Sequence, residues 1–197
     1  MDKALKQKIQ QLAKEEIAIV SYNPSWPRLF EKEKTFLQEI LPSKLIGKIE
    51  HFGSTAVPGL SAKPIIDMLI EVNSLEETKK NIVPILEAEG YEYLWRPTIG
   101  TDPPYYAWFI KRNSDGLRSH HIHMVESDSE LWNRLLFRDY LRDFPAEAKR
   151  YDTLKKSLAK RYAHDRIGYT KQKSTYIKNI MKKAITYYLQ KPNRSKE

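Results

Sequence analysis

The sequence predicts an α/β protein with a mixed, mostly antiparallel sheet of about five strands, helices on one side of it, and a C-terminal helical segment. Two apolar, β-branched runs, residues 45–52 and 65–72, are long enough to be buried strands. A later pair of such runs flanks residues 113–116, Asn-Ser-Asp-Gly, which is typical of a β-hairpin turn. Segments with apolar residues at helical spacing precede and follow these strands.

Length and composition limit the class of protein. The 197 residues contain no obvious linker, which predicts a single domain, 1–197, with 145–190 as a basic helical segment. The absence of cysteine excludes disulfides and thiolate metal sites and suits a reducing cytoplasm. No apolar run approaches the length of a membrane span, and no signal peptide precedes the first predicted helix. We therefore expect a soluble, cytoplasmic protein without a membrane partner.

Positive charge is concentrated near the C-terminus. The formal net charge is +9, and residues 153–197 alone carry 13 Lys and Arg against Asp165 and Glu197. Such a region attracts polyanions, for example a nucleotide, nucleic acid or an acidic partner protein. A solvated lysine face on amphipathic helices would have the same composition. Nucleic acid is the less favoured partner, because the sequence has no aromatic–glycine RNA motif and no recognition-helix signature.

Two helices are predicted before the first strand. Residues 2–17 form a charged helix with weak amphipathicity. A short extended piece, 20–22, separates it from the second helix, where Ser25 can act as the N-cap and Pro27 can occupy the first turn. This second helix, 26–41, carries the apolar residues of a core-facing surface.

A third helix follows the second apolar run. Ser74 and Glu77 form a capping box, and Gly90 supplies a stop signal, which together predict a helix over 75–89. Pro84 lies inside this helix, where it removes a backbone hydrogen-bond donor and predicts a kink.

Three further strands complete the predicted sheet. Residues 91–96 form the first of them. Residues 97–104 contain two threonines, a glycine and two adjacent prolines, which predicts an exposed loop that could border a site. Residues 105–112 and 117–125 form the two strands of the hairpin.

Three helices are predicted in the C-terminal part of the chain. Ser127 or Ser129 can cap the first, which ends near Phe144. The proline that follows opens the second helix, which continues to about residue 164. The third covers about 170–190 and carries an apolar stripe among many lysines.

The turn between the two apolar runs carries the strongest chemical signal. Gly53 and Ser54 directly follow a strand and offer amide and hydroxyl groups to an anion, most obviously phosphate. Fourteen positions after Gly53, Asp67 is the only charge between Pro64 and Ile70. A lone buried carboxylate is costly unless a metal, a cation or hydrogen bonds satisfy it. The turn therefore predicts a phosphate or metal site, with a tight turn whose aspartate bonds to loop amides as the alternative.

The last predicted strand supplies further candidate ligands. Alternation places His121 and His123 on one face of the sheet, and Arg118 and His120 on the other. Two imidazoles at i and i+2 can bind one metal or contact phosphate oxygens, and they can transfer protons near neutral pH. Surface or hydrogen-bonded core histidines are the alternative. We expect His123 and Asp67 to face a common pocket.

The string from Gly53 to Asp67 resembles the hallmark of the GrpB family, also called UPF0157: Gly-Ser-Thr-Ala-Val-Pro-Gly-Leu-x-Ala-Lys-Pro-x-Ile-Asp. The Val-x-Tyr-x-Pro-x-Trp string at 20–26 and the Phe-Arg-Asp-Tyr-Leu-Arg string at 137–142 are also similar to that family. The match extends from about residue 20 to about residue 180. That family belongs to the nucleotidyltransferase superfamily typified by DNA polymerase beta, so the resemblance implies a nucleotidyltransferase-like fold.

The resemblance also implies roles for particular residues. The catalytic residues would be Asp67, His121 and His123. Of these, Asp67 and His123 would bind Mg²⁺ or Mn²⁺, and the histidines would serve as substitute ligand or base. Binding and charge neutralisation of a nucleoside triphosphate, as substrate or ligand, would involve Gly53, Ser54, Thr55, Lys63, Arg118 and Lys173.

One position departs from the superfamily pattern. Aligned without a gap, Asp67 falls on the second of the two usual carboxylates and Ile65 on the first, and an isoleucine cannot bind a metal. A one-metal enzyme, an enzyme with substitute ligands and a non-catalytic nucleotide-binding domain all stay open. Glu71, on the same strand face as Asp67, would be an extra ligand in the enzyme.

Two functions follow from these expectations. The first is binding of a nucleoside triphosphate with a divalent cation, with possible transfer of a nucleotidyl group to an acceptor hydroxyl. The alternative is a non-catalytic module that binds a nucleotide or another phosphorylated small molecule. Members of the family occur fused to dephospho-coenzyme A kinase, which suggests an auxiliary role in coenzyme A metabolism. The sequence predicts no particular acceptor, base or oligomeric state.

Overall fold

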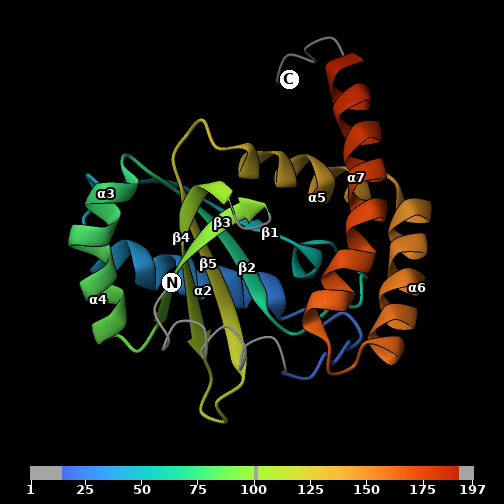
Figure 1. The fold of residues 1–197 in the computed structure, drawn as a ribbon, viewed down its shortest axis with the longest axis horizontal. Coiled ribbons are helices and arrows are strands. Elements are labelled where there is room, and N and C mark those ends of the chain that lie inside the picture. The colour runs from blue at the N-terminus through green and yellow to red at the C-terminus, as the bar shows by residue number, and fades with distance from the viewer. Residues whose placement is uncertain (1–14, 100–101, 191–197) are drawn as a thin grey trace.

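The computed structural model describes residues 15–99 and 102–190, which form an α/β fold around a five-stranded sheet (Figure 1). The helix predicted over 2–17 lies outside the described residues except for its last positions, 15–17, which are not helical.

The sheet is mixed and mostly antiparallel, as predicted. Its strands are β1 (Ile46–Phe52), β2 (Ile66–Val72), β3 (Glu92–Ile99), β4 (Asp102–Arg112) and β5 (Arg118–Val125). They lie side by side in the order β1-β2-β5-β4-β3. Strands β2 and β5 run parallel, and each of the other neighbouring pairs is antiparallel. The parallel pair in the centre brings the two strands with the candidate ligands next to each other.

The prediction of an exposed loop over 97–104 is wrong. Strand β3 continues to Ile99 and β4 begins at Asp102, with Pro97 paired to Tyr105. Prolines are tolerated on edge strands and at irregular positions, because no ladder hydrogen bond is lost there. Both conditions hold, since β3 is an edge strand and its register shifts between Pro97 and Ile99.

The helices begin and end close to the predicted positions. They are α2 (Trp26–Ile40), α3 (Leu75–Glu77), α4 (Val83–Ala88), α5 (Asn133–Asp143), α6 (Pro145–Arg161) and α7 (Arg166–Gln190). Ser74 caps α3 by accepting hydrogen bonds from the amides of Glu76 and Glu77, whereas the Ser25 side chain makes no capping bond to α2. Helix α7 begins four residues earlier than predicted.

The helix predicted over 75–89 is interrupted by a π-helical turn. This turn, η2 (Thr78–Ile82), joins α3 to α4, and Pro84 lies in the first turn of α4. A proline has no N–H to donate, and its ring clashes with the carbonyl four residues before it. A wider π turn relieves that clash, so the predicted kink takes the form of an expanded turn.

Helices α2 and α4 cover one face of the sheet. Alternate residues of β2 point toward these helices and form the larger apolar core with them. This core includes Trp26, Phe30, Leu37, Ile66, Met68, Ile82 and Leu86. Because side chains alternate along a strand, Asp67 points to the opposite face.

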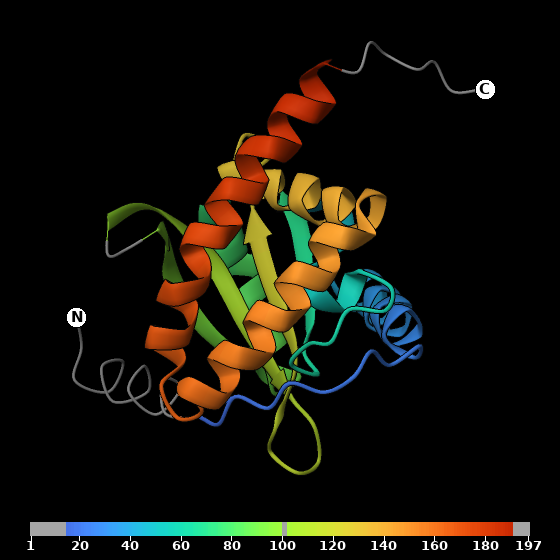
Figure 2. The ribbon, with the colours of Figure 1, turned by 90° about the vertical axis from the view of Figure 1, so that its right-hand side faces the viewer.

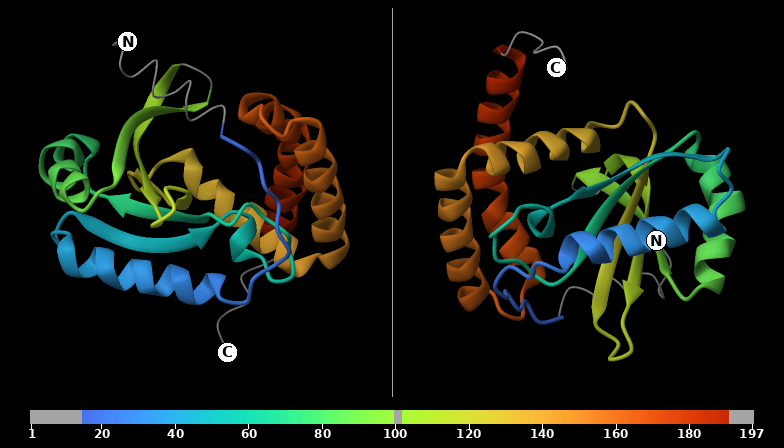
Figure 3. Two further views of the ribbon diagram at one scale, coloured as in Figure 1. Left: turned by 90° about the horizontal axis from the view of Figure 1, so that it is seen from below. Right: turned by 180° about the vertical axis from the view of Figure 1, so that it is seen from behind.

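The C-terminal helices stand against that opposite face. Leu131 and Leu135 pack on it beside Leu69. Helices α5, α6 and α7 form a separate apolar cluster that includes Val57 and Leu60 from the loop after β1. Figure 2 shows α6 and α7 crossing in front of the strands, and Figure 3 shows α2 on the other side of the sheet. Helices therefore flank the sheet as predicted, but on both faces rather than on one.

Within 15–99 and 102–190, every helix is too short or too polar to cross a lipid bilayer.

Candidate functional site

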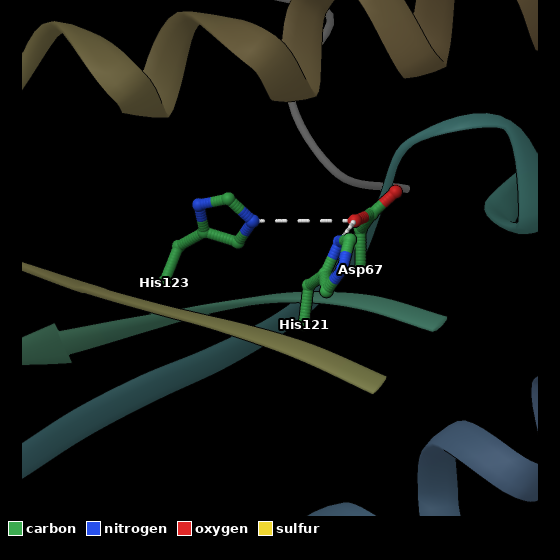
Figure 4. Close-up of side chains that lie close together, drawn as sticks. All are labelled: Asp67, His121 and His123. Atoms are coloured by element: carbon green, nitrogen blue, oxygen red, sulfur yellow. Dashed lines mark hydrogen bonds and ion pairs between the residues drawn. The ribbon is translucent and has the colours of Figure 1, made fainter. Parts of the chain in front are cut away.

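Asp67, His121 and His123 form a cluster on the face of the sheet that α5 and α7 adjoin (Figure 4). Asp67 is paired with His121 across the parallel β2–β5 ladder. His121 Nδ1 lies 3.1 Å from Asp67 Oδ1, and His123 Nε2 lies 4.0 Å from the same oxygen. One ligand atom from each residue lies within 4.8 Å of the others. His123 and Asp67 therefore lie on the same face of the sheet, as the predicted common pocket requires.

The Asp67 carboxylate keeps access to solvent. Its side chain is 28% exposed, although its neighbours on β2 are buried. Among the described residues its hydrogen-bond partner is the His121 imidazole and not an amide of the preceding loop. The alternative of a carboxylate satisfied only by loop amides is therefore excluded.

Aromatic side chains of β4 hold both imidazole rings in place. The Tyr106 hydroxyl is 3.1 Å from His123 Nδ1, and the two rings stack with centroids 5.4 Å apart. The Trp108 ring meets His121 edge-on, with centroids 5.0 Å apart. Tyr106 and Trp108 were not among the predicted site residues, although alternation along the hairpin places them on the histidine face.

At neutral pH the three side chains of the cluster have the protonation states of metal ligands. Burial lowers the pKa of His121, and lowers that of His123 well below its ordinary value, although the Asp67 charge opposes both shifts. Burial alone would raise the pKa of Asp67, but the His121 hydrogen bond and nearby cations lower it to about 2. An ionised carboxylate and two neutral imidazoles are the protonation states in which these groups bind a divalent cation.

The donor set discriminates between cations. One carboxylate oxygen and two imidazole nitrogens suit Mn²⁺, Fe²⁺ or Zn²⁺, whereas Mg²⁺ prefers oxygen ligands and retains several waters. The residues present therefore fit a divalent metal, and of the two predicted ions Mn²⁺ fits better than Mg²⁺.

The Gly53–Ser54 turn lies beside this cluster. Gly53 has φ +75° and ψ −171°, a backbone conformation that is essentially restricted to glycine. A Cβ at this position would overlap Asp67 Oδ2, so the turn packs directly against the carboxylate. Ser54 begins the 3-10 turn η1 (Ser54–Ala56).

Thr55 is engaged within the loop. Its hydroxyl donates to the Ile65 carbonyl over 3.3 Å and lies 3.0 Å from His51 Nε2. The side chain is buried on the α2 side, where His51 stacks on Phe30 with centroids 4.8 Å apart. Thr55 is thus a structural residue of the turn, and its hydroxyl is not directed at the cluster as the expected phosphate contact would require.

Lys63 and Lys173 reach the site from distant parts of the chain. Their Nζ atoms lie 5.6 Å and 4.7 Å from the Tyr169 ring centroid. Burial and repulsion from Lys173 and Arg166 lower the pKa of Lys63 to about 7, and burial lowers the pKa of Lys173 to about 8. The Asp67 charge opposes both shifts, so both lysines lie close enough to feel it. Neither lysine forms an ion pair within the described residues.

Arg118 differs from its predicted position. The β4–β5 register shifts between Lys111 and Arg112, which places Arg118 opposite Arg112. Paired residues share a face of the sheet, so Arg118 lies on the His121 face and not on the His120 face that strict alternation predicted. Its guanidinium pairs with Glu15, with Nε 2.5 Å from Oε2. A carboxylate therefore already neutralises this predicted phosphate-binding cation.

Two arginines near His123 were missed. The Arg96 guanidinium lies over the Trp108 ring at 4.4 Å, and that of Arg134 lies 5.8 Å from the Phe52 ring centroid. Both are exposed, and both lower the pKa of His123, for which burial is the larger cause. They come from β3 and α5, so no local pattern in the sequence connects them to the cluster.

Helix α5 is tied to the turn by two other arginines. Arg142 donates to the Ala56 carbonyl from Nε at 3.0 Å and from Nη2 at 2.7 Å. Arg138 donates to the His51 carbonyl over 2.8 Å and pairs with Glu50 at 2.9 Å. These bonds fix the turn against the helix that overlies the site.

Comparisons with known proteins agree on one family. The family model described as GrpB protein matches residues 16–183. The glutamate-rich protein GrpB of Alkalihalophilus pseudofirmus is 37% identical over 169 residues, which cover 85% of this chain and 95% of that protein. The crystal structure of the conserved protein GrpB from Enterococcus faecalis superimposes with a TM-score of 0.75 at 37% identity, covering 88% of this chain and 100% of that chain.

A more distant relative is larger than this chain. A dephospho-CoA kinase of Mycolicibacterium paratuberculosis is 26% identical over 195 residues, which cover 89% of this chain but 47% of that protein.

Proposed function

This chain belongs to the GrpB family. From this membership and the geometry of the site, we propose that the protein binds a nucleoside triphosphate together with a divalent metal ion. We propose further that it transfers a nucleotidyl group to an acceptor hydroxyl. One observation carries the proposal: Asp67 and two neutral histidines meet beside a glycine turn suited to phosphate. The charge of Asp67 also acts on Lys63 and Lys173, neither of which has a carboxylate partner among the described residues.

The metal would be held by Asp67 Oδ1 and His123 Nε2, with His121 as a third ligand or as the group that orients the carboxylate. When bound, a divalent cation polarises phosphoryl oxygens and neutralises charge on the leaving group. Tyr106 sets the His123 ring, because a proton on Nδ1 donated to the Tyr106 oxygen leaves the Nε2 lone pair directed toward Asp67.

The triphosphate would lie at the Gly53–Ser54 end of the site. The turn offers the Ser54 hydroxyl and backbone amides, and Lys63 and Lys173 supply positive charge from two sides. In the transfer step the acceptor oxygen bonds to the α-phosphorus, the bond from that phosphorus to its bridging oxygen breaks, and pyrophosphate leaves. The hydroxyl proton passes to the His121 imidazole when His121 is not a metal ligand.

A non-catalytic binding module is the second candidate, and Ile65 favours it. This buried side chain occupies the position of a carboxylate in the superfamily pattern, so two-metal chemistry lacks a ligand there. The relation to a dephospho-CoA kinase of about twice the length suits an accessory domain that binds a nucleotide in coenzyme A metabolism.

Thermal unfolding with ATP, GTP, CTP or UTP, each with and without MnCl₂, tests the binding step, because a ligand of the native state raises the midpoint temperature. We expect a Mn²⁺-dependent rise that Asp67→Asn abolishes. Glu71→Gln is the matched control: Glu71 lies on the same strand face but pairs with Lys48 at 3.2 Å. If Glu71 were the extra ligand the sequence suggested, this variant would also lose the rise.

Labelled nucleotide and a mixture of hydroxyl compounds then separate the two candidates. Metal-dependent release of pyrophosphate that is lost in Asp67→Asn supports the transferase. Nucleotide binding without turnover supports the module. Absence of a midpoint shift with all four nucleotides contradicts both.

A further inference from the structure

Arg96 lies at the end of the site away from the Gly53–Ser54 turn, and Arg134 lies between the two ends, near Phe52. We propose that they bind a phosphate or carboxylate group of the second substrate, so that the acceptor hydroxyl belongs to an anionic small molecule. This inference rests on the proposed function, since it assigns the substrate class of the same site.

The sheet register separates the two ends. Phe52, which precedes the turn, lies opposite Asp67, and His121 and then His123 follow along β5. Trp108 is opposite His123, and Arg96 is opposite Tyr106, one step further from the turn. Three strand spacings, about 14 Å, also separate β3 from β2. Arg96 is therefore displaced from the turn both along and across the sheet.

Aromatic rings direct the Arg96 guanidinium toward the cluster. It lies over Trp108, whose ring is 5.0 Å from that of His121 and 6.1 Å from that of His123. Arg134 approaches Phe52, whose ring meets His123 edge-on at 5.1 Å. Both cations thus converge on the surroundings of His123 from different elements, β3 and α5.

No carboxylate among the described residues pairs with either arginine. Other exposed cations have such partners, for example Lys48 with Glu71 and Arg150 with Glu147. Because both guanidiniums are exposed and have no carboxylate partner among the described residues, they are available to an anion that enters the site. The planar guanidinium fork binds the two oxygens of a phosphate or carboxylate better than an ammonium group does.

The triphosphate has a separate set of cations. Lys63 and Lys173 both lie over the Tyr169 ring and come from the β1–β2 loop and α7. Arg134 also acts electrostatically on Lys173, so it stands between the two ends, and Arg96 is the more specific residue to test.

Isothermal titration of the full chain tests the inference. The protein with MnCl₂ is titrated with glycerol 3-phosphate, D-glycerate or glycerol, both with and without saturating α,β-methylene ATP. We expect binding of an anionic compound but not of glycerol. Arg96→Gln should weaken that binding by about tenfold or more and change the affinity for the nucleotide analogue by less than about twofold. Lys63→Gln should show the reverse pattern.

Arg28→Gln is the matched control, because Arg28 is an exposed arginine of α2 on the opposite face of the sheet. Arg134→Gln provides a second variant, and the unfolding midpoint of each protein shows whether it is folded. Equal weakening of nucleotide and anion by Arg96→Gln would assign the arginines to the nucleotide site and overturn the inference. So would failure of both anionic compounds to bind under either condition.

The titrations without nucleotide separate this inference from the proposed function. If the nucleotide analogue fails to bind, but glycerol 3-phosphate binds and Arg96→Gln removes its binding, the arginine site stands and the proposed function falls.

Discussion

Two buried histidines of the sheet have different surroundings because their side chains point to opposite faces. His51 on β1 points to the α2 layer, where it stacks on Phe30 and bonds with Thr55. His123 points to the other face, toward Asp67. Aromatic groups and a hydroxyl contact both rings, but only the second also lies within 4.0 Å of the Asp67 carboxylate. His51 therefore contributes to stability, whereas His123 is available for chemistry.

His51 should make the fold less stable in acid. Burial lowers its pKa to about 4, and Arg142 and Arg138 act in the same direction, although Asp67 opposes them. The unfolded chain, with an ordinary histidine pKa of about 6.5, binds more protons between these values, so stability present above pH 6.5 is lost as pH falls toward 4. The expected loss from this group at pH 5 is about 2 kcal/mol.

Urea unfolding at pH 7.5 and pH 5 measures that loss. In His51→Gln the stability difference between the two pH values should shrink by about 2 kcal/mol relative to the wild type. The exposed His164 provides a control, and His164→Gln should leave the difference unchanged. An unaltered pH dependence in His51→Gln would contradict the assignment.

Gly53 should tolerate substitution much less well than Gly59. Both have positive φ, 75° and 76°, so alanine costs backbone strain at either position. At Gly53 the new Cβ also overlaps the Asp67 carboxylate, whereas at Gly59 it has nothing within 4 Å. We expect Gly53→Ala to lose about 3 kcal/mol and Gly59→Ala about 1 kcal/mol in urea unfolding. Equal losses would show that the close packing on Asp67 is unimportant.

At the scale of elements, the arginines of α5 position the Gly53–Ser54 turn. Arg142 donates two hydrogen bonds to the Ala56 carbonyl at the end of η1. Charge-assisted bonds to a backbone carbonyl restrain this turn, whose own backbone hydrogen bonds are 3.2 and 3.3 Å long. The turn and the helix should therefore move together.

Arg142→Gln should loosen the turn without unfolding the protein. We expect stability to fall by about 1–2 kcal/mol and amide exchange of residues 53–57 to accelerate. Hydrogen exchange read by mass spectrometry measures both the turn and the sheet. Arg150→Gln is the control, because that exposed arginine pairs only with Glu147 among the described residues. Exchange that accelerates equally throughout β2 would indicate global destabilisation instead.

Local patterns predicted most of the elements and some of the site. Alternation and turn signals located the strands. The string from Gly53 to Asp67 identified the turn and Asp67 as parts of a candidate site. The continuation of β3 through Pro97 and the bulge that reorients Arg118 were missed, because strand pairing with distant residues decides both. Arg96 and Arg134 were missed for the same reason: only the folded sheet brings them to His123.

At the scale of the whole molecule, the basic residues of the C-terminal helices differ in their surroundings. The sequence carries a net charge of +9, concentrated near its end, and composition alone does not distinguish a site from a solvated surface. In the structure, Lys173 of α7 lies over the Tyr169 ring, and burial lowers its pKa more than the charge of Asp67 raises it. Lys171, Lys178 and Lys182 on the same helix are exposed.

Lys173 should therefore matter to nucleotide binding far more than its neighbours on α7. Replacing it with glutamine removes a cation that the triphosphate would contact, and we expect affinity for α,β-methylene ATP with Mn²⁺ to fall by about tenfold or more. The triple variant Lys171→Gln, Lys178→Gln, Lys182→Gln removes three times the charge. Salt screens exposed charges beyond a Debye length of about 8 Å, so at 0.15 M NaCl this variant should change affinity by less than about twofold. Titration calorimetry at 0.05 and 0.15 M NaCl measures both effects. A larger loss in the triple variant at both salt concentrations would mean that the basic tail acts as a diffuse polyanion surface, with no lysine specific to the site.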